Sequence, residues 1–393
     1  MLAIVGVTKS WQNKHTQNDI TKLNTKEGPF MKRIGGLFED VYDINNLVLA
    51  HKNARKSKTF YTEVRMVDSN PGKYLYELQD AIKNHTYRTS EYEVFKKFDG
   101  RKEREIFKLP YYPDRVFQWA VIQVIEPYLL RTMTDDTYSA LPGRGTYRAY
   151  KRVKKALHTD VDGTQWCLKI DIAKYYPSID KQILKDKYAR MFKDKDLLEL
   201  LYEVIDSTPG PTGVPIGNYF SQYSGNIYLS DFDHKVKEEY KVKHYFRYMD
   251  DMVFLAATKE ELQQLIVKIV AYMENVLHLH VKDNWCIFKV DDRGVDFVGY
   301  VFKHNSIRLR KGIAQTLKHV SMKIKQRVNR GLQITYHLYC SINSICGWLK
   351  HCDSGGLRLK YVDVIWEHVV AYHDEVIINK SKNKKRRMQT CSC

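Results

Sequence analysis

The chain has 393 residues, of which 44% are hydrophobic and 12% aromatic, and its formal net charge at pH 7 is +18. So many apolar residues can bury a sizeable core, which excludes a globally disordered chain. No apolar run approaches the roughly 18 residues of a membrane span, so a transmembrane helix is excluded as well. The large basic excess indicates a polyanionic partner, and nucleic acid fits better than an anionic membrane surface.

The N-terminal third is predicted to be mainly helical. Residues 31–90 carry amphipathic helical patterns, and residues 116–130 are almost continuously apolar, which predicts a buried helix. Between them, residues 92–110 alternate apolar and polar side chains on both sides of Asp99-Gly100. This pattern predicts a β-hairpin.

The following residues alternate between short strands and helices. A strand is predicted to end at Asp171, and a Pro/Gly-rich loop over 208–217 leads to a helix capped by Asn218. Periodicity predicts further helices over 181–205, 259–277 and 313–328, two strands within 244–256, and a strand pair over 285–302. This alternation, with a basic helical C-terminal part, predicts an α+β fold.

The basic excess is concentrated in one stretch. Residues 297–352 contain ten Lys or Arg side chains and no Asp or Glu, which is over half of the net charge. A solvated surface normally mixes both signs, so this stretch predicts a surface that neutralises phosphates in a salt-dependent manner. Five of these cations are candidate nucleic-acid contacts: Arg308, Arg310, Lys311, Lys318 and Lys325.

The cysteines and the chain ends add little chemistry. Seven cysteines lack the paired spacing that holds zinc and are interpreted as incidental thiols in a reducing cytoplasm. Residues 1–30 are either a weakly ordered extension or upstream sequence read from an early start codon, because a more protein-like segment opens at Met31. Residues 380–393 begin with a basic run that is predicted to be a disordered tail holding nucleic acid.

Adjacent carboxylates at Asp250 and Asp251 are the most informative feature of the chain. They join two short apolar strands within residues 244–256. Two like charges at one turn are unfavourable unless a cation or a hydrogen-bond network neutralises them, and oxygen-only sites of this kind suit Mg²⁺. Such pairs also occur in ordinary solvated turns, so the assignment depends on what surrounds them.

Asp171 is the expected third carboxylate of the site. If the strand that it ends lies beside the Asp250-Asp251 hairpin, the three carboxylates converge within a few ångströms. Such a cluster can hold two Mg²⁺ ions about 3.5–4 Å apart, with Mn²⁺ as a substitute, to clamp the attacking and leaving oxygens of a phosphoryl transfer. Catalysis of this kind is mostly positioning and charge stabilisation, so no Ser-His-Asp or Cys-His arrangement is needed.

Three segments resemble motifs A, B and C of reverse transcriptases: residues 168–179, 213–222 and 248–251. The resemblance covers residues 40–365. It implies Asp171, Asp250 and Asp251 as metal ligands, with the Ile172 carbonyl as a further ligand. It also places Tyr176 where the family has an aromatic residue that collides with a 2′-hydroxyl, which favours deoxynucleotides; ordinary core packing is the alternative for this side chain.

Other segments resemble further parts of the same family. Residues 295–300 resemble the primer-grip hairpin, with four expected primer contacts: Phe297, Val298, Gly299 and Tyr300. Lys282 lies where the motif D lysine protonates pyrophosphate, although a plain surface lysine is an equally good interpretation. Three basic residues resemble the fingers side chains that touch triphosphate and template: Lys102, Arg104 and Arg144.

The resemblance implies a right-hand polymerase with fingers, palm and thumb, an antiparallel palm sheet and a helical thumb. The expected domains are N-terminal helices and fingers over 31–164, a palm with interleaved fingers helices over 165–302, a basic helical thumb over 303–379 and a basic tail over 380–393. The expected substrates and partners are an RNA template, a DNA or RNA primer and deoxynucleoside triphosphates.

Motif B points to a subfamily. Most reverse transcriptases carry Gln-Gly there, whereas this chain has Ile216-Gly217 followed by Ser221-Gln222, the form found in diversity-generating retroelements. Replacing an amide by Ile216 removes a hydrogen-bond donor near the incoming nucleotide, and a looser grip lowers discrimination between bases. The resemblance therefore implies an error-prone enzyme that misincorporates opposite adenine, with Ile216, Gly217 and Gln222 at the nucleotide and a small basic accessory protein as partner. Residues 138–142 depart from that subfamily.

Three alternatives remain. A bacterial or phage-encoded reverse transcriptase of phage defence has the same chemistry in another role. A group II intron protein is a weaker fit, because the 142 residues after Asp251 hold a thumb but no added endonuclease. A non-catalytic RNA-binding scaffold would make the aspartates vestigial, although all three are intact.

Overall fold

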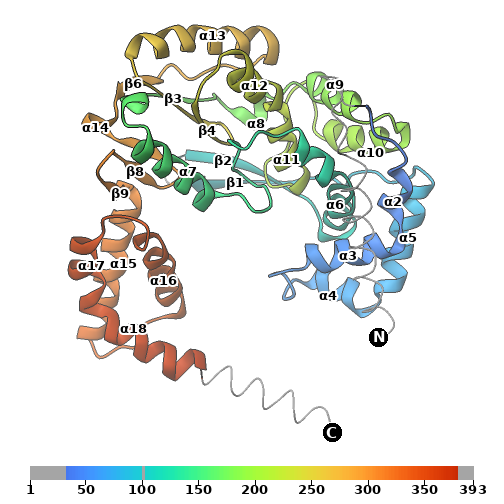
Figure 1. Ribbon diagram of the computed structural model, residues 1–393. Coiled ribbons are helices and arrows are strands. Elements are labelled where there is room, and N and C mark those ends of the chain that lie inside the picture. Colours follow the sequence, from blue (N-terminus) through green and yellow to red (C-terminus); the bar gives the residue numbers. More distant parts are fainter. Residues whose placement is uncertain (1–31, 100–101, 379–393) are drawn as a thin grey trace. The chain divides into compact units, whose positions relative to one another are not determined.

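The computed structural model describes residues 32–99 and 102–378 (Figure 1). These residues form two compact units. The first contains the described residues up to 145 together with 170–252 and 264–285, and the second contains 146–169, 253–263 and the described residues from 286 onward. The predicted N-terminal extension and basic tail lie outside the described residues.

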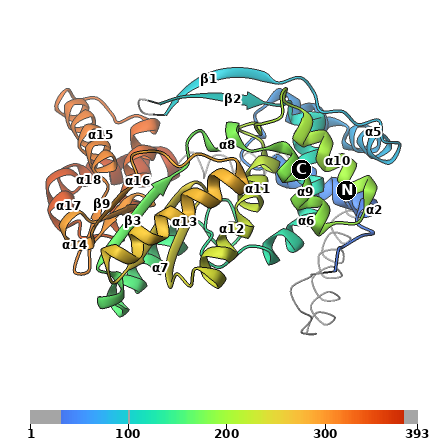
Figure 2. The ribbon, with the colours of Figure 1, turned by 90° about the horizontal axis from the view of Figure 1, so that it is seen from above.

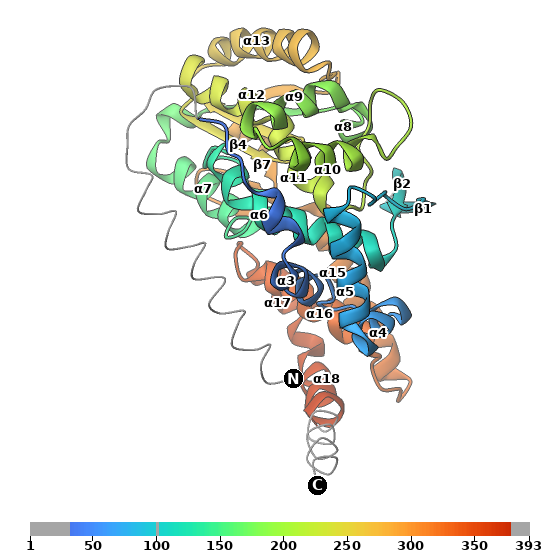
Figure 3. The same cartoon turned by 90° about the vertical axis from the view of Figure 1, so that its right-hand side faces the viewer.

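The first unit contains four N-terminal helices, and two of them, α2 and α3, pack against the apolar helix α6 (Val116–Arg131), whose predicted burial is confirmed. The four helices are α2 (Phe38–Tyr42), α3 (Ile44–Ala54), α4 (Thr62–Ser69) and α5 (Pro71–Lys83). Asp43 caps α3, and Pro71 opens α5 where a backbone N–H is not needed. Figure 3 shows α3 and α5 side by side, and Leu47 of α3 is fully buried in this core.

The predicted hairpin is confirmed as a two-stranded ribbon (Figure 2). Strands β1 (Glu93–Asp99) and β2 (Lys102–Lys108) pair antiparallel, with Glu93 opposite Lys108. At the base of the ribbon the Phe107 N–H donates to the Ile216 carbonyl at 3.0 Å. This bond ties β2 to the loop that precedes helix α11 (Tyr219–Tyr228).

The prediction of one helix over residues 181–205 is wrong. The chain forms two helices there, α9 (Lys181–Met191) and α10 (Lys195–Asp206). Asp194 explains the break, because one carboxylate oxygen accepts the Leu197 N–H as a helix cap and the other accepts N–H groups of residues 37 and 38. A carboxylate bonded in this way begins a new helix instead of continuing the old one.

Asn218 occupies the predicted cap position of α11, but its side chain makes no capping hydrogen bond. Its amide donates to the Tyr92 hydroxyl at 3.1 Å instead. The side chain therefore links the start of α11 to the segment that enters β1.

Four strands form a sheet in the order β4-β5-β3-β6. They are β3 (Trp166–Asp171), β4 (His244–Tyr248), β5 (Asp251–Ala256) and β6 (Cys286–Lys289). The predictions that one strand ends at Asp171 and that two strands flank the Asp250-Asp251 pair are confirmed. Nearby helices are α8 (Tyr175–Ser178), α12 (Ser230–His234) and α13 (Lys259–Leu277), the last with the predicted bounds.

The second unit contains a three-stranded sheet and most of the C-terminal helices. The strands are β7 (Val295–Phe297), β8 (Tyr300–Phe302) and β9 (Ile307–Leu309), and the short helix α14 (Val290–Arg293) precedes them. The predicted pairing within 285–302 is corrected: β6 pairs with β3, whereas β7 pairs with β8. Gly294, with φ of 83°, turns the chain between β6 and β7 and separates the two sheets.

The helices of this unit are α7 (Thr146–Thr159), α15 (Lys311–Asn329), α16 (Tyr336–Leu349), α17 (Gly355–Tyr361) and α18 (Trp366–Tyr372). Helix α15 confirms the predicted amphipathic helix and buries Leu317, Val320 and Ile324 of its apolar face. Helices α16 and α17 both pack against α15. The predicted α+β class is therefore confirmed. None of the described helices is both long and apolar enough to span a bilayer.

Candidate active site

A short continuation of strand β3 brings Asp171 to Lys282. Beyond the strand, Ile172 pairs with Val281 as an antiparallel bridge, and the Lys282 N–H donates to the Asp171 carbonyl at 3.0 Å. These backbone contacts place the Lys282 Nζ atom 2.7 Å from Asp171 Oδ1. Two predicted catalytic residues that are far apart in the sequence are therefore in contact.

The Asp171 carboxylate lies near enough to Asp250 to act on its charge. Burial, and then the neighbouring Asp171, raise the pKa of Asp250 to about 6, while Lys282 acts in the opposite direction. The Asp171 Oδ1 atom is shielded from solvent, and its contact with Lys282 is an ion pair without hydrogen-bond geometry. A buried carboxylate oxygen of this kind, beside a second carboxylate, fits a divalent cation bound by oxygen ligands.

The spacing of the three carboxylates is wider than predicted. Among the described residues, no group that includes Asp171, Asp250 and Asp251 has all its ligand atoms within 4.8 Å of one another. The donors still suit Mg²⁺, which prefers carboxylate and carbonyl oxygens, and the Ile172 carbonyl stays a predicted ligand.

A buried arginine fixes the turn that carries Asp250. The turn passes through Met249, whose φ of 60° places a non-glycine residue in the left-handed region, a conformation that costs about 1 kcal/mol. The Arg247 side chain is fully buried, and its Nη1 donates to the Met249 carbonyl at 3.1 Å and to Asn226 Oδ1 at 3.2 Å. These bonds offset the strain and hold the turn in one conformation.

Asp233 neutralises Arg247 inside the protein. Both side chains are fully buried, and two parallel bonds of 2.8 and 2.5 Å join the guanidinium to the carboxylate. The Tyr245 and Thr137 hydroxyls also donate hydrogen bonds to the Asp233 carboxylate, at 2.7 and 3.0 Å. Burial disfavours the charged form of the Arg247 guanidinium. The ion pair with Asp233 favours the charged form more strongly and raises the pKa of Arg247. We refer to these residues as the Arg247 network.

Tyr176 lies against the same turn. Its hydroxyl donates to Met249 Sδ at 3.4 Å, and burial raises its pKa. Helix α11 reaches this point through Gly225, where an added Cβ would lie 3.2 Å from Met249 Sδ and 3.4 Å from the rings of Tyr175 and Tyr176. The small residue on α11 therefore leaves room for the aromatic side chain next to Asp250.

The glycine-bearing loop before α11 joins the hairpin to Tyr176. The Val214 N–H donates to the Tyr176 carbonyl at 3.0 Å, and the Ile216 carbonyl accepts the Phe107 N–H. Gly217 has φ of 115°, and a Cβ there would lie 3.2 Å from the Phe107 carbonyl oxygen. The loop thus has a defined place, whereas nucleotide contacts by Ile216, Gly217 and the exposed Gln222 stay predictions.

The three predicted fingers cations lie in different surroundings. Arg104 is exposed on β2, and Lys102 begins the same strand, although its side chain is outside the described part of the structure. Arg144 is largely buried, and its Nη1 donates to the carbonyls of Thr134 and Thr137 at 2.5 and 2.9 Å. Arg144 therefore stabilises its own loop, and contact with a triphosphate stays a prediction.

The predicted primer grip forms the turn between β7 and β8 in the second unit. Val298 and Gly299 both have positive φ, 42° and 89°, and Phe297 and Tyr300 are the paired strand residues on either side. An added Cβ at Gly299 would lie 2.4 Å from the Trp348 ring, so only glycine fits this turn.

The predicted nucleic-acid cations in this unit are mostly exposed. Arg308 lies on β9, and Lys311, Lys318 and Lys325 lie on α15 with exposed side chains. Arg310 is different, because its Nε donates to Asp296 Oδ1 at 2.5 Å and this ion pair braces the primer-grip turn.

Residues 96–302, just over half of the chain, match the family model for reverse transcriptase (RNA-dependent DNA polymerase). The chain belongs to the reverse transcriptase family. This membership confirms the expected fold class of an α+β right-hand polymerase.

Two curated relatives of this reverse transcriptase are bacterial. Protein YkfC of Escherichia coli (strain K12) is 27% identical over 142 residues, covering 34% of this chain and 37% of the relative. The group II intron-encoded protein LtrA of Lactococcus lactis subsp. cremoris is 20% identical over 394 residues, covering 81% of this chain and 62% of the relative. The chain thus spans about two fifths to three fifths of the length of these relatives.

Solved structures similar to the reverse transcriptase chain include two telomerases. Apo telomerase from Candida tropicalis aligns with a TM-score of 0.47 at 14% identity, covering 75% of this chain and 58% of that chain. Telomerase from Candida albicans, in complex with the TWJ fragment of telomeric RNA, aligns with a TM-score of 0.45 at 12% identity, covering 72% and 58%.

Sequence reasoning missed the Arg247 network of this reverse transcriptase. Arg247 is a charged residue in the apolar strand β4, and that contrast was the available signal. Its partner Asp233, in helix α12, carries no local signal, because only the tertiary fold brings it to β4. Gly225 was missed for the same reason.

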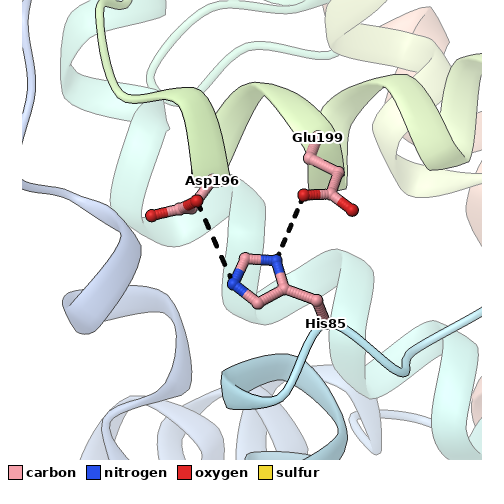
Figure 4. A group of neighbouring side chains, drawn as sticks. All are labelled: His85, Asp196 and Glu199. Carbon is pink, nitrogen blue, oxygen red and sulfur yellow. Dashed lines mark hydrogen bonds and ion pairs between the residues drawn. The ribbon is translucent and has the colours of Figure 1, made fainter.

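A cluster of His85, Asp196 and Glu199 is the one group of metal-type side chains among the described residues whose ligand atoms all lie within 4.8 Å (Figure 4). The histidine contacts the two carboxylates at 4.0 and 3.1 Å, and its ring stacks on Phe38. All three side chains are at least 36% exposed. We interpret the cluster as surface ion pairs that join the end of α5 to α10, since exposed pairs of this kind are common without a metal.

Proposed function

We propose that this chain is an RNA-directed DNA polymerase that extends a primer with deoxynucleoside triphosphates on an RNA template. The observation that carries the proposal is the placement of the Asp171 and Asp250 carboxylates near each other, with Lys282 in contact with Asp171 and Tyr176 against the turn that carries Asp250. The predicted division into fingers, palm and thumb belongs to the same proposal.

Asp171, Asp250 and Asp251, with the Ile172 carbonyl, are the proposed ligands of two Mg²⁺ ions, for which Mn²⁺ substitutes. When bound, these ions supply charge stabilisation at the attacking and leaving oxygens of the phosphoryl transfer. Before binding, the Lys282 ammonium neutralises Asp171. On release from Asp171 it becomes available to donate a proton to the pyrophosphate leaving group.

Tyr176 is the proposed filter for the sugar. Its hydroxyl is bonded to the Met249 sulfur, and its ring fits against Gly225 of α11. The ring therefore cannot move away from a 2′-hydroxyl without displacing the turn. A rigid aromatic wall rejects the larger ribonucleotide through steric overlap.

Primer extension tests the proposed reaction. The full chain is incubated with a primed RNA template, Mg²⁺ and either deoxynucleotides or ribonucleotides. We expect extension that copies the RNA with deoxynucleotides and little use of ribonucleotides. Failure to extend any primer on RNA, under conditions where the chain binds the primed template, would overturn the proposal.

We further propose the error-prone role of a diversity-generating retroelement. Support comes from Ile216, whose side chain lies on the loop that joins Phe107 of the hairpin to the Tyr176 segment. An apolar side chain at that junction offers no hydrogen bond to the incoming base pair, so discrimination rests on shape alone. A small basic accessory protein is part of this role.

The fidelity of two variants tests this role. Ile216→Gln restores an amide and should reduce errors opposite template adenine by roughly tenfold, whereas Ile216→Leu keeps the side chain apolar and should leave them unchanged. Equal error rates in both variants and the wild type would contradict the assignment. Sequencing of nucleic acids that co-purify with the chain separates the roles, because protective or untemplated DNA would favour phage defence.

A further inference from the structure

An aromatic cavity of about 260 Å³ lies within the second unit, between the start of α7, strand β8 and the end of α16. Five rings line it: Tyr147, Tyr150, Tyr300, Trp348 and His351. Tyr300 is also an expected primer contact, whereas the other four rings belong to no predicted site. We call it the aromatic cavity.

The buried rings of Tyr150 and Tyr300 form the floor of the cavity, and the exposed ring of Tyr147 forms an accessible wall. Tyr150 and Tyr300 are buried, and the Tyr300 hydroxyl donates to the Trp348 carbonyl at 3.1 Å, which fixes that ring. Tyr147 is 49% exposed and packs against His351, with ring centroids 4.8 Å apart. An exposed ring beside a buried aromatic floor offers a π-face to a flat, conjugated ligand.

Gly347 keeps the cavity open. It lies inside helix α16, where glycine is less stable than alanine by about 1 kcal/mol, and an added Cβ would meet no atom within 4 Å. Packing within the chain therefore does not require glycine at this position. The contrast is Gly299, where an added Cβ would collide with the Trp348 ring.

The charges around the cavity favour an anionic ligand. Among the described residues no acidic side chain lines it, whereas two other cavities of the same unit include Asp363 and Glu375 in their linings. The Lys151 Nζ atom lies 4.4 Å from the Tyr147 ring centroid, on the accessible wall. The Asp353 carboxylate acts electrostatically on Tyr150. It does not line the cavity, and it accepts the Ile307 N–H at 2.8 Å.

We propose that the aromatic cavity binds an unpaired nucleobase of the bound nucleic acid, which stacks on Tyr147 while Lys151 neutralises a flanking phosphate. Base stacking on aromatic side chains tolerates any sequence, because every base has a π-face. An aromatic side chain of a protein partner fits less well, because it would bring no phosphate to neutralise Lys151. The inference rests on the proposed function, since it requires the chain to bind nucleic acid.

Fluorescence of a single-stranded oligonucleotide that carries 2-aminopurine tests this inference on the full chain, because stacking quenches the probe. Two variants address the cavity: Tyr147→Ala removes the wall, and Gly347→Leu fills the space. Two matched controls lie elsewhere in the same unit: Tyr336→Ala, an exposed tyrosine of α16, and Gly312→Leu, a helical glycine with open space around it.

We expect quenching with the wild type and both controls. Both cavity variants should lose the quenching and bind the strand roughly tenfold more weakly. An oligonucleotide made only of abasic nucleotides should bind the wild type and the cavity variants equally.

Tight binding with the same quenching in all five proteins would overturn this inference and leave the proposed function intact. So would equal affinity of the wild type for the base-containing and abasic strands, which would show that the cavity binds no base. If the chain binds no oligonucleotide, both the inference and the proposed function fail.

Discussion

The Arg247 guanidinium donates a hydrogen bond to the Met249 carbonyl, 3.1 Å away, so a fully buried cation holds the turn on which Asp250 lies. The same guanidinium is locked to Asp233 by two parallel bonds. Positioning of the metal-binding turn therefore depends on an ion pair inside the protein, which salt screens much less than an exposed pair.

Removal of one partner of this ion pair should be strongly destabilising. Arg247→Met leaves the Asp233 carboxylate buried without its cation, and we expect a loss of about 3–5 kcal/mol in the free energy of unfolding. The double variant Arg247→Met/Asp233→Leu leaves no uncompensated charge and should recover much of that stability, but not activity, because the Met249 carbonyl still lacks its donor. Urea unfolding measures the first effect and primer extension the second. A double variant with full activity would contradict the positioning role.

The stability of the metal-free protein should depend on the ionisation of Asp250. Its pKa is raised to about 6 from an ordinary value of 3.8. Above pH 6 the Asp250 carboxylate is ionised in the folded state, although ionisation is easier in the unfolded chain. This difference lowers the free energy of unfolding by at most about 3 kcal/mol. As the pH falls from 6 towards 4, the folded state takes up the proton first, so this cost disappears.

Thermal unfolding in a chelator measures this dependence. We expect Asp250→Asn to be more stable than the wild type at pH 7.5 and the difference to vanish near pH 4. Equal stability of Asp250→Asn and the wild type at both pH values would show that Asp171 does not raise the pKa of Asp250.

Mg²⁺ should stabilise the folded chain and compete with Lys282 for Asp171. Because binding requires ionised carboxylates, the rise in melting temperature with Mg²⁺ should shrink as the pH falls below 6. Lys282→Met removes the competing ammonium and should tighten Mg²⁺ binding several-fold, while it slows extension by roughly tenfold or more. Calorimetric titration with Mg²⁺ gives the first quantity and single-turnover extension the second. Weaker Mg²⁺ binding in Lys282→Met would contradict the competition.

Discrimination against ribonucleotides should depend on Tyr176. Tyr176→Val removes the ring next to Met249 and should raise the use of ribonucleotides relative to deoxynucleotides by about tenfold to a hundredfold. Tyr202→Val, at a half-buried tyrosine of α10, is the control and should leave the preference unchanged. The ratio of kcat/KM for the two nucleotides decides the outcome, and an unchanged ratio in Tyr176→Val would assign the ring to packing alone.

Much of this architecture could be predicted from local patterns. Periodicity and turn chemistry predicted the ribbon around Asp99 and helix α13, because these elements are set by nearby residues. The break before Asp194 escaped prediction, because that carboxylate also bonds to residues 37 and 38, which lie far away in the sequence.

The site shows the same division. Asp171, Asp250 and Tyr176 could be predicted because each lies in a short motif with a recognisable spacing. The Arg247 network and the space at Gly225 depend on contacts between segments that only the tertiary fold brings together. The predicted convergence of the carboxylates did not include Lys282, whose ammonium contacts Asp171 at 2.7 Å.

The proposed function requires the Asp171 and Asp250 carboxylates for nucleotide transfer. Initial rates of primer extension on an RNA template, with saturating Mg²⁺ and deoxynucleotides, test it most directly. We predict that Asp250→Asn loses roughly a thousandfold in rate, while Asp162→Asn, at an exposed aspartate, keeps the wild-type rate. Extension by Asp250→Asn at the wild-type rate would contradict a catalytic role of Asp250.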